Sequence, residues 1–518
     1  MQSRRENIAW HLSQQPMLRV LLPVVAGVVL ADRLTLPLWS VAVGFVLAMV
    51  AAWRWRTQRR GGAALAAAFL LLGMLAVGVR RGAELPPEEL LGQRGAVAEI
   101  AIERVASRSG DALFCDGRIV AHRGVDMAEA KVVNWPVRVK VDSTVGVQIG
   151  SRIVAQPRIR LFSGDSDSGF ERYMARRGFV GQVSIGPSDL LRHTEGMPIV
   201  CSLHDEALQR LSRLRLGDEE RAVVEAMSIG ERVSLGAELR QRYARSGAAH
   251  LLAVSGLHVG FVFAIINLLL TVVALLRHGQ VVRGVVAIAA IWIYAAVAGA
   301  SPSVVRAAVM FSILQVAFML SARTQALNSL GFTACVMLMW DATLLYDVGF
   351  LLSFSAVAGI VVWGVPLSRL SNLLKPDRVR RVNYGRDWRD VAYRVVAYGW
   401  HAVAMSVAAS VATMPIAAYM FGVVSLWSVV IGPLAVAMGM AIVCAAMAWI
   451  LLPLGFMQGV ASWLLDNLTS LLNGIVGWCS QHDVLLYEGE ISLWMCILCY
   501  ILFGLSVLWL WSREKEVV

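Results

Sequence analysis

Residues whose types and spacing could support chemistry are concentrated in the segment 247–260, Gly-Ala-Ala-His-Leu-Leu-Ala-Val-Ser-Gly-Leu-His-Val-Gly. His250, Ser255 and His258 stand there at the start of a long apolar region, where polar side chains are costly and are usually retained for a function. If the segment is helical, Ser255 and His258 lie three residues apart on one face. Gly256 and Gly260 form a G-x-x-x-G step, which lets another helix approach closely.

Three interpretations of this segment remain open. The first is a tightly packed helix start in which the histidine is only hydrogen-bonded. The second is a row of donors along a polar path through a membrane. The third is a hydrolase within the membrane that uses Ser255 and His258, although the sequence shows no evident third group to orient the histidine.

The composition indicates that the elements around this segment are membrane helices. Of the 518 residues, 57% are hydrophobic and 16% are charged, which is too apolar for a soluble protein and indicates a polytopic membrane protein. The formal net charge is +11, and in a membrane protein much of such an excess can serve as an orientation signal.

The segment from His250 to Gly260 resembles the signature of the ComEC family, whose competence domain forms the inner-membrane DNA-uptake channel of natural transformation. Segments 150–178, 229–239 and 349–354 also resemble this family, so the resemblance covers most of the chain. It implies a channel for single-stranded DNA in the bacterial inner membrane. Two departures stand out, because the usual Asn-Pro before Gly169-Phe170 is missing and segment 427–433 lacks the usual Asn before its proline.

The apolar runs and the basic residues between them predict the membrane topology. The basic residues fall in every second loop, and the alternate loops near 299–303, 341–347, 422–425 and 479–490 contain no Lys or Arg. This alternation predicts about twelve transmembrane helices with both termini in the cytoplasm. The alternative is that one of the eighth to eleventh runs is re-entrant, and the predicted count is ten to twelve. A signal-peptidase site after Ala31 is the alternative to an uncleaved anchor in the first run. The runs are 17–31, 35–53, 63–79, 250–276, 284–300, 303–320, 326–345, 348–366, 395–421, 425–452, 457–478 and 491–511.

The polar segment between the third and fourth runs predicts an inserted all-β domain. Short strand-like runs at 96–105, 112–122, 135–142, 151–161 and 179–185 are separated by Gly, Asp and Ser. Five strands at this spacing favour a small barrel, and the resemblance implies an OB-like extracytoplasmic domain. Residues 200–246 then read as amphipathic helices on the outer membrane surface. The predicted domains are 1–81 (three membrane helices), 82–195 (OB-like), 196–246 (helical connector) and 247–518 (competence-type channel).

Basic and aromatic residues of the β domain form a candidate DNA-binding face. A single-strand groove needs cations for phosphate contact and aromatic rings for base stacking. A solvated basic face over an aromatic core explains the same pattern. The basic candidates are Arg158, Arg160, Arg172, Arg176 and Arg177, and the aromatic ones are Phe162, Phe170 and Tyr173.

Arg306 is the most unusual residue of the apolar half. Ser301 and Pro302 suit the N-cap and first position of a helix, which places Arg306 about one turn in. A helix N-terminus with an arginine attracts anions, and phosphate is the anion that the resemblance implies. The alternatives are that Arg306 reaches the interface or pairs with Asp347. The full set of channel-lining candidates is Ser255, Gly256, His258, Arg306, Ser353, Ser355 and Pro415, the last because a proline in an apolar run predicts a kink facing a cavity.

The sequence also indicates what the chain lacks. It shows no P-loop and no dense His/Asp cluster of a metallo-β-lactamase-like nuclease, so we expect a non-enzymatic channel without a cofactor or a metal. The resemblance then implies single-stranded DNA and lipid as partners, with a ComEA-like receptor, a helicase-type motor and a nuclease as separate proteins, and assembly with further copies of the chain. A membrane scaffold that does not conduct DNA is the alternative function.

The seven cysteines show no disulfide framework. The extracytoplasmic domain of the family can carry a disulfide, which only Cys115 and Cys201 could supply here. Cys496 and Cys499 form C-x-x-C inside an apolar run, and we expect both to be small core residues.

Overall fold

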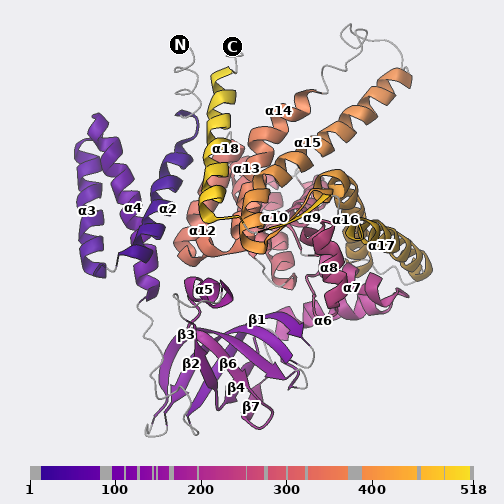
Figure 1. The fold of residues 1–518 in the computed structure, drawn as a ribbon, viewed down its shortest axis with the longest axis horizontal. Helices are drawn as coiled ribbons and strands as arrows, with labels where there is room; N and C mark the ends of the chain where they lie inside the picture. Colours follow the sequence, from indigo (N-terminus) through magenta and orange to yellow (C-terminus); the bar gives the residue numbers. More distant parts are fainter. Residues whose placement is uncertain are drawn as a thin grey trace.

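A computed structural model describes most of the chain and divides it into a large helical region and a β-sheet region at one end (Figure 1). The described residues are 13–34, 36–81, 96–109, 112–124, 129–142, 145–147, 150–162, 169–194, 198–252, 254–273, 278–298, 302–320, 325–370, 388–451, 457–482, 485–489 and 491–513.

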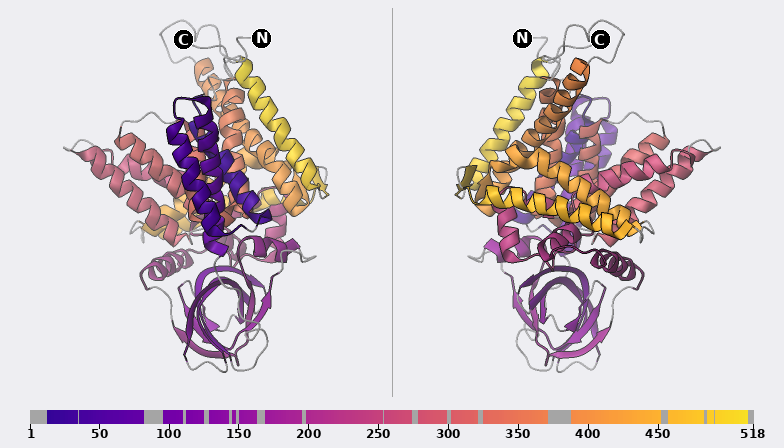
Figure 2. Two further views of the ribbon diagram at one scale, coloured as in Figure 1. Left: turned by 90° about the vertical axis from the view of Figure 1, so that its left-hand side faces the viewer. Right: turned by 90° about the vertical axis from the view of Figure 1, so that its right-hand side faces the viewer.

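The β region is one seven-stranded sheet in the order β5-β6-β3-β2-β1-β4-β7. All pairings are antiparallel except that of β3 with β6, and the sheet curls into a ring (Figure 2). The strands are β1 (Val97–Ser109), β2 (Ala112–Arg123), β3 (Lys131–Asp142), β4 (Arg152–Ala155), β5 (Arg158–Leu161), β6 (Gly181–Ile185) and β7 (Leu190–Thr194), with helix α5 (Gly169–Arg176) between β5 and β6.

Alternation along β3 builds the core of this sheet. Trp135, Val137, Val139 and Val141 are buried, at every second position, and pack with the buried residues of β1, β2, β4 and β6. Cys115 lies in the same core as a free thiol, so the disulfide allowed by the resemblance is not formed at that residue.

The run expected as one strand over 151–161 is two strands. Pro157 separates β4 from β5, and a proline cannot donate to a sheet ladder. The chain changes partner at this point, because β4 pairs with β1 whereas β5 pairs with β6. Strand β7 was not expected, since its five residues are half-buried or exposed and show no buried alternation.

The helical region contains five helical segments long and apolar enough to cross a membrane, within the described residues. The helices are α2 (Pro16–Arg33), α3 (Leu38–Arg54), α4 (Arg59–Arg81), α6 (Pro198–Ser212), α7 (Asp218–Ser228), α8 (Ala237–Arg245), α9 (Gly256–Leu269), α10 (Gly279–Val297), α11 (Pro302–Met319), α12 (Ala326–Trp340), α13 (Val348–Gly359), α14 (Val365–Ser368), α15 (Trp388–Phe421), α16 (Trp427–Leu451), α17 (Gln458–Ser480) and α18 (Leu493–Arg513). A π-helical turn, Ile360–Gly364, joins α13 to α14, and the five spanning segments are Arg60–Val79, Gly279–Val297, Val348–Ser368, Tyr393–Phe421 and Trp427–Leu451.

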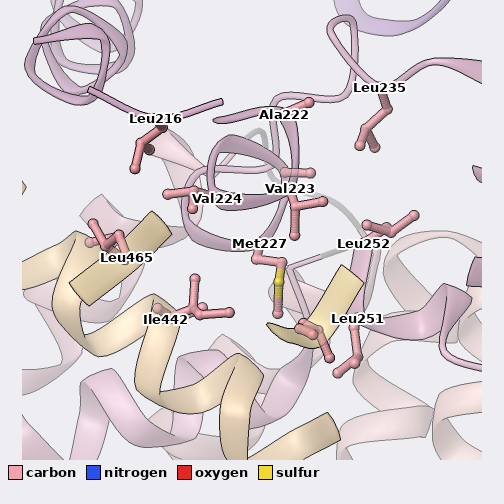
Figure 3. Close-up of a cluster of buried hydrophobic side chains, with 14 of the residues drawn as sticks. Leu216, Ala222, Val223, Val224, Met227, Leu235, Leu251, Leu252, Ile442 and Leu465 are labelled. Atoms are coloured by element: carbon pink, nitrogen blue, oxygen red, sulfur yellow. The ribbon is translucent and has the colours of Figure 1, made fainter. Parts of the chain in front are cut away.

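The connector helices α6, α7 and α8 do not lie loosely on a surface. Together with α16, α17 and the short 3-10 helix Ala249–Leu252, they form the largest buried cluster among the described residues (Figure 3). Every residue of α7 from Ala222 to Ser228 is buried, including Glu225. The prediction of an amphipathic surface helix was therefore wrong for α7. Two further short strands, β8 (Val423–Ser425) and β9 (Leu486–Glu488), pair with each other beside this cluster.

The prediction that both cysteines of the C-x-x-C pair are core residues is confirmed for only one of them. Cys496 is buried within α18, but Cys499 on the same helix is exposed, so the prediction that both are core residues was wrong for Cys499. The two side chains point about 60° apart around the helix axis, so Cys499 lies beside the buried face of α18 and not within it.

Candidate functional site

Ser255 and His258 come together as a cap on α9. Ser255 is the N-cap residue, and the two residues form a reciprocal capping box in which the Ser255 backbone N–H donates to His258 Nδ1 at 3.2 Å. His258 is 2% exposed. The pair therefore does lie on one side of the helix start, and the N–H of the imidazole is on Nε2, because Nδ1 accepts.

The two glycines of the segment bring α11 against α9. A Cβ on Gly260 would lie 2.8 Å from the Phe311 ring, and one on Gly256 would lie 3.4 Å from the Ala307 Cβ and 3.6 Å from Arg306 Nη2. Such contacts leave no space for a larger side chain at Gly260. The capped start of α9 is thereby placed directly beside the Arg306 guanidinium.

Arg306 is a buried cation with an incomplete set of partners. Its side chain is 3% exposed. Nη2 donates to the Ser303 carbonyl at 3.3 Å, and the guanidinium lies 5.3 Å from the centroid of the Phe354 ring on α13. Nη1 is buried and has no hydrogen-bond partner. Buried polar atoms are normally paired, so this atom calls for a ligand or a function. Ser301 lies outside the described residues, and Pro302 begins α11 as expected.

Asp347 does not form an ion pair with Arg306; its carboxylate instead contacts residues of the β region. It caps α13 by accepting from the Phe350 backbone N–H at 2.9 Å. Its Oδ2 lies 3.6 Å from Arg177 Nε and 3.4 Å from the Tyr173 hydroxyl, both at helix α5. Burial raises the pKa of Tyr173, as does the nearby Asp347 carboxylate, so the hydroxyl stays protonated and can donate.

Ser355 and Pro415 belong to one structural arrangement. Pro415 lies inside α15 and supplies no N–H to the carbonyl four residues before it. At the adjacent carbonyl, that of Ala412, two hydroxyls from other helices converge: Ser355 Oγ of α13 at 2.5 Å and Tyr500 Oη of α18 at 2.7 Å. Neighbouring helices re-satisfy backbone groups near a membrane proline in this way. Ser353, on the same helix as Ser355, is half-buried.

The basic candidates of the β region separate into two groups. Arg158 and Arg160 are exposed on β5, where Arg160 pairs with Glu171 at 2.8 Å and Phe162 meets Phe170 edge-to-face at 6.1 Å. Arg177 instead lies at the junction with Asp347. The side chains of Arg172 and Arg176 lie outside the described residues.

Sequence reasoning missed Phe354 as the ring beneath Arg306 and Tyr500 as the second donor at Ala412. A proline in an apolar run signals that donors are needed nearby, but it does not say which helix supplies them. Within the described residues, no group of three or more His, Cys, Asp or Glu side chains is arranged to hold a metal ion.

The chain is similar in sequence to known proteins. The chain is similar to ComE operon protein 3 of Bacillus subtilis (strain 168), with 26% identity over 147 residues, or 28% of this chain and 19% of that protein. It is also similar to an uncharacterized protein of Aquifex aeolicus (strain VF5), with 31% identity over 169 residues, or 32% of this chain and 39% of that protein. These matches span less than half the length of either relative, and no solved structure matches the chain. The family described as competence protein matches residues 227–513, more than half of the chain and the whole of the site around Arg306. The chain is therefore a membrane protein that belongs to the competence protein family.

Proposed function

We propose that this chain conducts single-stranded DNA across the bacterial inner membrane during natural transformation. The observation that carries the proposal is Arg306, a buried guanidinium whose Nη1 has no partner among α9, α11 and α13. A charge within a membrane protein is expensive and marks a path or a site for a ligand. A DNA strand carries one charge per nucleotide, and a phosphate oxygen is the acceptor that a free guanidinium nitrogen suits best.

The surroundings of Arg306 fit brief contact with a phosphate better than tight binding of one. Phe354 covers one face of the guanidinium, and Nη2 already donates to the Ser303 carbonyl, so only part of the group is free for a passing phosphate. A channel must bind its cargo weakly enough to release it. Strand entry requires α9 and α13 to part from α11, because the guanidinium is closed off in this arrangement.

For the β region we infer an OB-like barrel that receives the strand. In support, β4 and β5 are consecutive in the chain yet pair with opposite ends of the series β6-β3-β2-β1, which brings the two ends of that series together. Parallel pairing of β3 with β6 within a small closed sheet fits an OB-type barrel. Exposed Arg158 and Arg160 beside the half-exposed Phe170 supply cations and a ring for phosphate contact and base stacking.

The same function implies partners and an orientation. We propose that the β region faces the periplasm and that both termini are cytoplasmic; the start of α2 and the end of α18 both lie at the end of the helical region away from the sheet (Figure 1). A ComEA-like receptor, a helicase-type motor, a nuclease and further copies of the chain remain proposed partners. A non-conducting scaffold is the alternative, and the engaged state of His258 and Ser355 is the observation that favours it.

The test is the substitution Arg306→Gln, with Arg306→Lys as the charge-retaining comparison. A hydrogen bond to a charged group contributes about 1.5–3 kcal/mol, so losing it along the path should lower transformation about 10- to 100-fold. Membrane-inserted protein is quantified in the same cells, so that misfolding is not mistaken for lost conduction. Unchanged transformation in the glutamine variant at normal protein level would contradict the channel proposal and favour the scaffold.

A further inference from the structure

Helix α17 is attached along one whole face to the polar connector segment. Ser462 Oγ accepts from the Arg215 backbone N–H at 3.1 Å, and Asp466 Oδ1 accepts from that of Gly217 at 3.2 Å. Further along, Asn473 Oδ1 accepts from the Tyr243 hydroxyl at 2.8 Å. These contacts run from the second turn of α17 to its last third, so the middle of the helix lies along the connector segment.

Helix α16 is held by the same layer at both ends. Near its start, Ser428 packs against Gly247, where a Cβ would lie 2.7 Å from the Ser428 Cβ. Near its end, Trp449 Nε1 donates to the Arg210 carbonyl at 2.8 Å, and Arg210 Nη1 donates to the Ile450 carbonyl at 2.6 Å. A helix that crossed the bilayer would have its two ends about 30 Å apart on opposite sides.

The connector layer cannot lie within the hydrocarbon. Arg213, Arg215 and Asp218 are exposed beside the first half of α17, and the side chain of Glu219 is 50% exposed in its pair with Arg242. Exposed charges at membrane depth are strongly unfavourable. Whatever is bound along this layer therefore lies at the membrane surface.

Three independent features agree with this position. Helix α17, with 23 residues, is not among the helices apolar enough to cross a membrane, although α16 is by length and composition alone. The connection between them reads Leu-Pro-Leu-Gly-Phe over 452–456 and has no Lys or Arg, unlike the loops expected in the cytoplasm. In the right-hand view of Figure 2, α17 runs across the direction of α15 and α18.

The face of α17 turned away from the connectors is apolar and exposed. Val460, Trp463, Leu471 and Trp478 lie on this face at helical spacing and are 57%, 67%, 58% and 54% exposed. Asn467, exposed between them, donates its amide back to the Trp463 carbonyl of the same helix. A helix with a hydrogen-bonded polar face and an outward apolar face lies in the interface with its apolar side in the lipid. Trp463 and Trp478 are residues of the type that favours this depth.

We propose that α16 and α17 form an in-plane hairpin bound to the lipid surface on the same side as the β region, and that neither helix crosses the membrane. The crossings are then α2, α3, α4, α9, α10, α11, α12, α13 with α14, α15 and α18, ten in all. Both termini stay on one side, and every basic loop keeps its orientation. This arrangement holds whether or not the chain conducts DNA.

The decisive measurement is the side from which the connection between α16 and α17 is reached. The test substitution is Gly459→Cys, because a Cβ at Gly459 meets open space and the new side chain therefore fits without a clash. Gly236→Cys at the start of α8 is the matched control for the β-region side, and Gly62→Cys in α4 is the control for the opposite side; both also meet open space. All three are made in a background without native cysteines and exposed to a membrane-impermeant maleimide in intact spheroplasts.

We expect positions 236 and 459 to react before lysis and position 62 only after it. Reaction at 459 only after lysis, together with position 62, would overturn the proposal. Cysteines at positions 215 and 462 supply a second measurement, because the Arg215 backbone N–H lies 3.1 Å from the Ser462 hydroxyl and the two positions are therefore close. Their oxidative cross-linking in cells is expected, whereas no cross-link in a normally inserted protein would contradict the hairpin even if position 459 were shielded by lipid.

Discussion

The convergence of Ser355 and Tyr500 on the Ala412 carbonyl allows a quantitative test of what these hydroxyls do. The two oxygens lie 2.5 and 2.7 Å from the carbonyl oxygen and 3.1 Å from each other. Ser355→Ala or Tyr500→Phe removes one donor and leaves the other. Each should therefore lower the free energy of unfolding by about 0.6 kcal/mol, the average for hydrogen bonds between membrane helices.

The double substitution should cost more than the sum of the single ones. It leaves the Ala412 carbonyl with only the donor of its own helix, next to the Val411 carbonyl that Pro415 deprives of an N–H, and a lost buried hydrogen bond costs about 0.5–1.5 kcal/mol. We expect a coupling free energy of about 1 kcal/mol in a double-mutant cycle, measured by denaturant unfolding in bicelles. Ser506→Ala is the control, because that hydroxyl bonds to Phe503 of its own helix.

Two results would refute this reasoning. Additivity within about 0.3 kcal/mol would show that the hydroxyls do not share the carbonyl. Loss of transformation by Ser355→Ala without any change in stability would show that this hydroxyl acts on the DNA path and is not mainly a support for α15.

Three other predictions test other parts of the molecule. Gly247→Ala should lower the free energy of unfolding by about 1 kcal/mol or more, because Gly247 has φ +75° and contacts Ser428. The control Gly236→Ala, with open space around the residue, should change the free energy of unfolding by only a few tenths of a kcal/mol. Equal melting temperatures of the two variants would contradict this prediction. Trp135→Ala should cost about 3–5 kcal/mol in denaturant unfolding of the β region, since the ring is 2% exposed; a loss under about 1 kcal/mol would contradict its place in the core. His204 faces two acceptors, Glu231 at 3.6 Å and the Val297 carbonyl at 2.8 Å. The hydrogen bond with Glu231 raises the pKa of His204 above 6.5, so the stabilisation by this histidine is full below pH 6.5 and is lost as the pH rises through the raised pKa. We therefore expect His204→Gln to flatten the pH dependence of stability in that window.

The local features of the signature could be predicted from sequence, but their roles could not. Ser255 stands three residues before His258, and this spacing correctly placed them on one side of a helix start. A histidine in the third helical position as a capping partner, in place of Glu or Gln, is a matter of side-chain geometry that spacing alone does not reveal. The close approach at Gly256 and Gly260 was predicted as well, and only the structure shows that α11 is the helix that approaches.

Tertiary placement explains most of what the sequence could not provide. The hydropathy of α16 satisfies the criterion for a membrane span, because hydropathy does not distinguish lipid contact from burial against α7. The strand expected over 151–161 failed at Pro157 because alternation continued through a change of partner strand. In both cases the local pattern was right and the neighbour was unknown, which is the ordinary limit of periodicity.

The position of Asp347 explains why Arg306 is left with an unpartnered nitrogen. The sequence offered Asp347 as an acid for Arg306, and such a pair would have neutralised the cation inside the helical region. The structure gives the carboxylate to Arg177 and Tyr173 of the β region instead. One acid thus fixes the β region to the start of α13, while Phe354, two turns further along the same helix, lies against the guanidinium. Arg306 therefore keeps Nη1 without a hydrogen-bond partner, and the proposed phosphate path rests on this feature.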